Sequence, residues 1–158
     1  VIRPQVGAEV RVGSRVSGVV SRLHVRVGDA VEKGQLLARL DDTDLRARRD
    51  EAAAVLREAE VEHRWATADL ARKRALAAAG GLAPSERELA ERAAGLAEQR
   101  VAGTRAALTY AEAQLAHTRI VAPIAGVVAS VATQEGETVA ASLAAPTFLT
   151  LLDPDRLE

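Results

Sequence analysis

Residues 42–118 constrain the fold most, because they have the composition of two long helices that need a packing partner along their whole length. Ala, Leu, Arg and Glu, all strong helix formers, dominate this stretch. Gly80-Gly81 is a helix-ending signal, and Pro84 suits the first turn of a new helix. We expect helices over about 43–79 and 84–118, each about 50 Å long at about 1.5 Å per residue.

The two arms are nearly equal in length, so each is the obvious partner of the other in an antiparallel coiled-coil hairpin. The first arm carries a heptad-like series of small and apolar residues at Leu45, Ala52, Leu56, Ala59, Ala66, Leu70 and Ala77. The return arm carries two neighbouring rows of period seven, Leu89, Leu96, Gly103 and Tyr110, and Ala94, Val101, Leu108 and Leu115. Both rows are expected to pack on the first arm, with Trp65 near Leu96.

Short β-like segments flank the helical stretch, and the two flanks resemble each other. Ser17-Gly18-Val19-Val20 matches Ala125-Gly126-Val127-Val128, and each is followed at the same spacing by a Gly-acid turn. Both flanks then end on Leu-Asp. This agreement favours a duplicated β unit over two unrelated hairpins. Within the first flank, the alternation over residues 23–27 predicts a half-buried strand.

The predicted fold class is therefore α+β, a split β domain with a long inserted helical hairpin. The first β half is expected over residues 1–41, the hairpin over 42–118 and the second β half over 119–158.

The composition argues against several kinds of function. The chain has no Cys and no Met, so it offers neither a disulfide framework nor soft-metal ligands, and its three His are scattered. A formal net charge of −1 provides no basic field for nucleic acid. No nucleophile motif or phosphate-binding loop is present. We expect no catalytic residues, no cofactor and no metal site, and therefore no enzymatic activity.

With this layout, the chain resembles periplasmic adaptor subunits, also called membrane fusion proteins (HlyD/RND-type), of bacterial efflux and type I secretion systems. Residues 15–20, 27–31 and 33–38 are similar to the first half of the family's lipoyl-like (biotinyl/lipoyl) domain. Residues 118–128, Thr-Arg-Ile-Val-Ala-Pro-Ile-Ala-Gly-Val-Val, resemble the return into its second half.

The resemblance implies an adaptor that links an inner-membrane transporter, of RND or ABC class, to an outer-membrane channel. Such proteins form homo-oligomeric rings, commonly hexamers, in which the hairpins make a tube. The implied location is the periplasm, with anchoring to the inner membrane through a segment absent from this chain.

The resemblance also implies that an Arg, a Leu four residues later and a Ser contact the channel at the hairpin tip. Arg72 and Leu76 match the first two. The family's Ser position falls on Ala83, whereas Ser85 lies two residues further along, so the sequence departs from the pattern there. The alternatives are a solvated Arg72, a packing role for Leu76 and a helix-capping role for Ser85.

Two other classes of function compete with the adaptor. A lipoyl or biotin carrier needs a Lys at the tip between its two β halves, but the helices replace that tip. The only lysines are Lys33, in an internal turn, and Lys73, on the hairpin. A non-transport coiled-coil scaffold is the second alternative.

Overall fold

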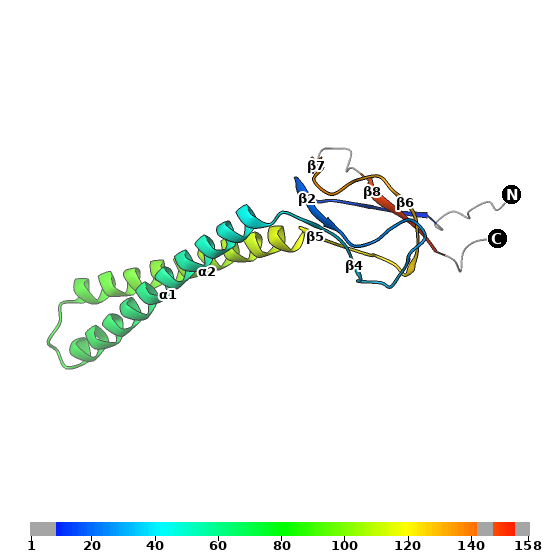
Figure 1. Ribbon diagram of the computed structural model, residues 1–158. Coiled ribbons are helices and arrows are strands. Elements are labelled where there is room, and N and C mark those ends of the chain that lie inside the picture. The colour runs from blue at the N-terminus through cyan, green and yellow to red at the C-terminus, as the bar shows by residue number, and fades with distance from the viewer. Residues whose placement is uncertain (1–8, 142–146, 154–158) are drawn as a thin grey trace. The chain divides into compact units, whose positions relative to one another are not determined.

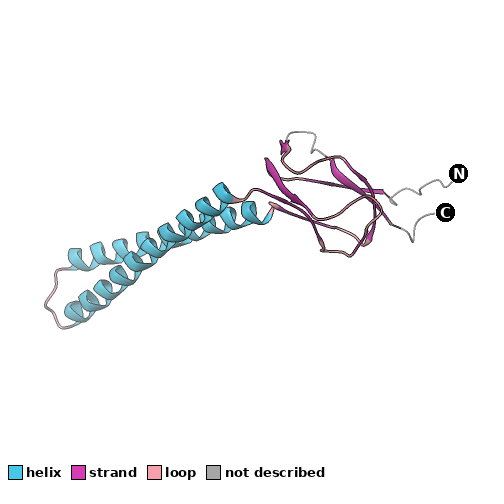
Figure 2. Cartoon of the chain, viewed as in Figure 1, coloured by secondary structure: helices cyan, strands magenta, loops and turns pink. Residues whose placement is uncertain are grey.

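The computed structural model describes residues 9–141 and 147–153, so parts of both predicted β halves lie outside the described residues. Within these residues, eight strands and two helices follow one another (Figures 1 and 2). They are β1 Glu9–Gly13, β2 Gly18–Leu23, β3 Ala30–Val31, β4 Leu36–Leu40, α1 Thr43–Ala78, α2 Pro84–Ala116, β5 Arg119–Val121, β6 Gly126–Val131, β7 Thr138–Val139 and β8 Thr147–Leu152. The chain divides into two compact units, a β unit from both ends and a helical unit, Leu45–Glu112.

The β unit consists of two four-stranded sheets that have the same internal plan. One sheet has the order β1-β8-β6-β3 and the other β5-β4-β2-β7, with antiparallel pairing throughout. Exchanging each strand of the first half for its counterpart in the second converts one sheet into the other. Each sheet therefore contains strands from both halves.

Equivalent backbone hydrogen bonds join the two halves. The N–H of Gly28 donates to the carbonyl of Val128, and the N–H of Gly136 donates to the carbonyl of Val20, both at 2.8 Å. Two return bonds, from Val128 to Asp29 and from Val20 to Glu137, are both 2.9 Å long. The duplication predicted from sequence is thus present as a pair of matching, mutually dependent halves.

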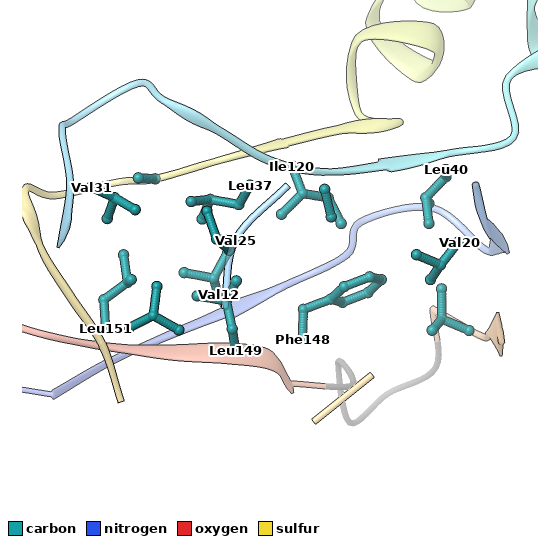
Figure 3. Close-up of a cluster of buried hydrophobic side chains, with 14 of the residues drawn as sticks. Val12, Val20, Val25, Val31, Leu37, Leu40, Ile120, Phe148, Leu149 and Leu151 are labelled. Carbon is teal, nitrogen blue, oxygen red and sulfur yellow. The ribbon is translucent and has the colours of Figure 1, made fainter. Parts of the chain in front are cut away.

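The two sheets enclose one hydrophobic core (Figure 3). Phe148, Leu149 and Leu151 on β8 face Leu37 and Leu40 on β4, and all five side chains are essentially inaccessible to solvent. Strand β8 is paired on both edges, by β1 and β6, and is buried over four consecutive residues. The expected α+β class, a lipoyl-like split β domain with an inserted helical hairpin, is confirmed.

One local prediction in the first flank is wrong. Strand β2 ends at Leu23, and Val27 is exposed rather than paired. The N–H of Arg26 donates to the Asp29 carboxylate at 2.8 Å, and the N–H of Asp29 donates back to the Arg26 carbonyl at 3.1 Å. These bonds close a turn in which only Val25 reaches the core.

The helical unit has a narrow interface made mostly of alanine. Ala59 and Ala66 on α1 and Ala90 and Ala97 on α2 are buried, together with Leu56. Ion pairs cross between the helices, from Arg105 to Glu60 at 3.1 Å, from Arg74 to Glu91 at 3.6 Å and from Arg100 to Glu58 at 3.9 Å. The helices are therefore antiparallel neighbours that bury little apolar surface per turn.

The prediction for the return arm is half right. The row at Ala94, Val101, Leu108 and Leu115 is partly buried and belongs to the interface. The prediction that the other row also packs on α1 is wrong, since Leu89, Leu96 and Tyr110 are 65%, 62% and 67% exposed. The fully buried seam positions are alanines apart from Leu56, whereas the three large side chains of the second row remain outside the seam.

The equivalent glycines of the two halves differ in their surroundings, which gives a matched test. A Cβ on Gly126 would lie 2.4 Å from the backbone oxygen of Leu152, whereas one on Gly18 would meet Leu40 Cβ at an ordinary 3.6 Å. Gly126→Ala is expected to lower the free energy of unfolding by about 2 kcal/mol. Gly18→Ala should change it by less than about 1 kcal/mol. Urea unfolding of both variants measures this, and equal losses would contradict the asymmetry.

Candidate functional site at the hairpin tip

The end of α1 is a Schellman motif built on the two tip glycines. The N–H of Gly81 donates to the Leu76 carbonyl and the N–H of Gly80 donates to the Ala77 carbonyl, both at 3.0 Å. Gly80 has a φ of 78°, a left-handed conformation that glycine adopts without strain. The motif fixes the direction in which the chain leaves the helix, directly beside Leu76.

The start of α2 is set by Ala83. Its carbonyl accepts the N–H of Glu86 at 3.1 Å and that of Arg87 at 3.5 Å, and Pro84 begins the helix. Ser85 is therefore inside the first turn and is not the cap. Its side chain is exposed.

Arg72 lies on α1 within an exposed charge cluster. Its guanidinium is 3.3 Å from Asp69 Oδ1, and the Lys73 ammonium is 3.1 Å from Asp69 Oδ2. The hydrogen bond from Lys73, aided by Arg72, lowers the pKa of Asp69 below its ordinary 3.8. The carboxylate is thus ionised at neutral pH. Any stabilisation from this cluster is present above about pH 3.8 and is lost as the pH falls through the lowered pKa.

Leu76 is 52% exposed, although it is a large apolar residue in the last turns of a helix. It lies one helical turn beyond Arg72, so these two side chains are neighbours on α1. Ser85 comes from the other side of the tip loop. A cation and an exposed Leu near the end of α1, and a hydroxyl in the first turn of α2, thus flank the tip loop, a set suited to binding another protein.

No metal site competes with the tip in the part of the chain that the structure describes. Within residues 9–141 and 147–153, no group of three His, Cys, Asp or Glu side chains could hold a metal ion. Lys33 is exposed in the turn between β3 and β4, and Lys73 forms an ion pair with Asp69. Among the described helices, neither is long and apolar enough to cross a membrane.

Sequence reasoning missed a shallow hollow on α1, lined by Glu58, Val61, Glu62 and Trp65. The sequence signal for this hollow is a large apolar residue, Trp65, at the position just before the seam residue Ala66.

Comparison with known proteins assigns the chain to a family. Residues 8–151 match the model described as the barrel-sandwich hybrid domain of RND membrane fusion proteins. The chain belongs to this family of membrane fusion proteins.

Individual relatives agree with this assignment. The chain is 33% identical over 159 residues to the macrolide export protein MacA of Escherichia coli O157:H7, which covers 92% of this chain and 43% of MacA. It is 34% identical over 154 residues to the pyoverdine export membrane fusion protein PvdR of Pseudomonas putida, covering 89% of the chain and 39% of PvdR. The chain thus spans less than half the length of these curated relatives.

Solved structures show the same fold. A MacA–MexA chimeric protein with the Pseudomonas aeruginosa MexA α-hairpin domain matches with a TM-score of 0.67 and 29% identity, over 96% of this chain and 49% of the chimera. The membrane fusion protein Spr0693 of Streptococcus pneumoniae R6 matches with a TM-score of 0.73 and 19% identity, over 99% of this chain and 63% of that one.

The tip geometry makes a prediction that separates its two glycines. Gly80→Ala places a Cβ in a left-handed conformation and is expected to destabilise the hairpin by about 1 kcal/mol. Gly81→Ala is the control, because its Cβ would meet only the Leu76 oxygen at 3.7 Å. Thermal unfolding followed by helical circular dichroism measures both. A Gly81→Ala loss as large as that of Gly80→Ala would contradict the Schellman assignment.

Proposed function

We propose that this chain is the lipoyl–hairpin core of a periplasmic adaptor that links an inner-membrane transporter, of RND or ABC class, to an outer-membrane channel. Membership of the membrane fusion protein family supports the proposal, as do relatives that are named export proteins. Residues 1–41 and 119–158 form the collar domain in this proposal, and residues 42–118 form the spacer. The adaptor role is structural, with no catalytic step.

The observation that carries the docking proposal is the exposed Leu76 one turn beyond Arg72 near the end of α1. In this proposal Arg72, Leu76 and Ser85 contact the channel. The family's Ser position aligns with Ala83 in this chain, and Ser85, two residues later, supplies the hydroxyl instead. Burial of a half-exposed Leu side chain against a partner lowers the free energy. A guanidinium donates directional hydrogen bonds to carbonyl or carboxylate groups.

Copies of the adaptor assemble as a homo-oligomeric ring in this proposal, commonly a hexamer in the family. The protein works in the periplasm and is held at the inner membrane by a segment outside this chain. Export by one ring requires every tip to reach the same channel, so a tip substitution acts on all copies at once.

Arg72→Asp in the full-length protein tests the docking role. The expected result is loss of most export, because the reversed charge repels the acceptor groups that Arg72 binds. Stability should change by less than about 1 kcal/mol, since the Arg72–Asp69 pair is exposed. Accumulation of an exported compound in cells gives the first readout, and thermal unfolding of the purified protein gives the second.

The matched control is Arg57→Asp, the same charge reversal at an exposed position further from the tip on α1. It should leave export intact. Equal export by Arg72→Asp, Arg57→Asp and the unaltered protein would remove Arg72 from the docking site.

A further inference from the structure

The two β halves place matching edge strands around one hollow of the β unit. The sequence offset that relates Gly18 to Gly126 also relates Arg11 on β1 to Arg119 on β5. Strands β1 and β5 each lie at the edge of their own sheet, so each is paired by a strand on one side only. A hollow of about 490 Å³ is lined by residues of both strands, including the two equivalent arginines.

The lining of this hollow combines apolar and basic side chains. Val12 and Ile120, a second equivalent pair, are almost fully buried and belong to the hydrophobic core (Figure 3). Val121 and Pro123 are exposed and add apolar surface. Among the described residues that line the hollow, none is acidic. The basic lining groups are Arg11, Arg15, His117 and Arg119. A hollow of this size accommodates a small organic molecule.

The positive charges around the hollow are largely uncompensated. Within the described part of the chain, neither Arg15 nor Arg119 forms an ion pair. Arg11 contacts Glu9 at 3.5 Å, but both side chains are largely exposed, and an exposed pair of this kind contributes little. The whole chain carries a formal net charge of −1, so this excess of positive charge is local. A hollow with three such guanidinium groups attracts anions.

A row of like charges across one sheet ends at the same hollow. The strand register pairs Arg22 on β2 with Arg39 on β4, and Arg39 with Arg119 on β5. All three side chains are exposed, and none forms an ion pair with a residue that the structure describes. Like charges at directly opposite positions destabilise a sheet. An anion bound beside Arg119 would lower this repulsion, so its binding would stabilise the β unit.

The side chains of the hollow favour an anion with more than one negative charge and an apolar body. Guanidinium groups donate paired hydrogen bonds to phosphate or carboxylate oxygens. Three guanidinium groups supply more charge and more donors than a single carboxylate can use. A phosphate monoester carries nearly two negative charges at neutral pH and three strong acceptor oxygens. The apolar lining suits the hydrocarbon part of such an ester, because contact with it removes apolar surface from water.

We propose that the hollow between β1 and β5 is a binding site for an organic phosphate monoester. The phosphate contacts Arg11, Arg15 and Arg119, and the organic group packs on Val121 and Pro123. The site lies within the β unit and uses no residue of the hairpin tip. Its test measures ligand binding by the chain alone and no export, so this proposal and the adaptor function can fail separately.

Titration of the 158-residue chain with phenyl phosphate at low salt, followed by calorimetry and thermal unfolding, tests the site. We expect saturable binding at one site per chain and an unfolding midpoint that rises with ligand concentration. Phenol and inorganic phosphate should each bind at least about tenfold more weakly. Arg119→Gln should weaken binding of phenyl phosphate at least about tenfold. Without ligand, this variant should unfold at no lower temperature than the unaltered chain, because it removes like-charge repulsion.

Arg26→Gln is the matched control, since it removes the same charge at an exposed position of the β unit that does not line the hollow. Its affinity for phenyl phosphate should equal that of the unaltered chain. Phosphatidylcholine vesicles that contain phosphatidic acid distinguish two sources of the phosphate monoester. Vesicle binding that Arg119→Gln abolishes assigns the site to a lipid headgroup, and no vesicle binding assigns it to a free molecule. No saturable binding of phenyl phosphate, or equal losses in both variants, would overturn the proposal.

Discussion

Hydrogen bonds exchanged between the two β halves are the interaction on which the rest of the structure depends. The matching bonds from Gly28 to Val128 and from Gly136 to Val20 mean that neither half completes a sheet alone. The pairing of β4 with β5, including the bond from Leu40 N–H to the Thr118 carbonyl at 2.9 Å, also holds the two ends of the inserted segment side by side. The folded β core thereby offsets the entropy of closing a long insertion, which the thin hairpin interface would offset poorly.

The alanine seam explains the form of the helical unit. Small seam residues such as Ala59 and Ala66 on α1, and Ala90 and Ala97 on α2, allow close helix approach but bury little apolar area. Intrinsic helix propensity therefore contributes much of the stability of the two helices. This arrangement suits a spacer more than a core. It also leaves large side chains outside the seam, where they are available for contacts with other proteins.

Much of this architecture could be predicted from the sequence, because its signals were local. The duplication followed from repeated Gly-Val-Val and Gly-acid spacing, and the hairpin from breakers at Gly80 and Pro84. The choice between the two rows on α2 could not be made from the sequence, since both repeat every seven residues and only the folded hairpin shows which row faces α1. The strand prediction at Val27 was wrong because the Asp29 carboxylate closes a turn there despite the alternating sequence pattern. The tip residues Arg72, Leu76 and Ser85 remain predictions, since docking depends on a partner surface.

Cross-linking in living cells is the sharpest test of the proposed contact between the hairpin tip and an outer-membrane channel. A photoreactive amino acid would replace Leu82 in the tip loop of the full-length protein, and Arg57 in a control. If the tip docks on a channel, the group at position 82 captures one outer-membrane protein and the group at position 57 does not. Capture of no outer-membrane protein at Leu82, or the same products from both positions, would contradict it.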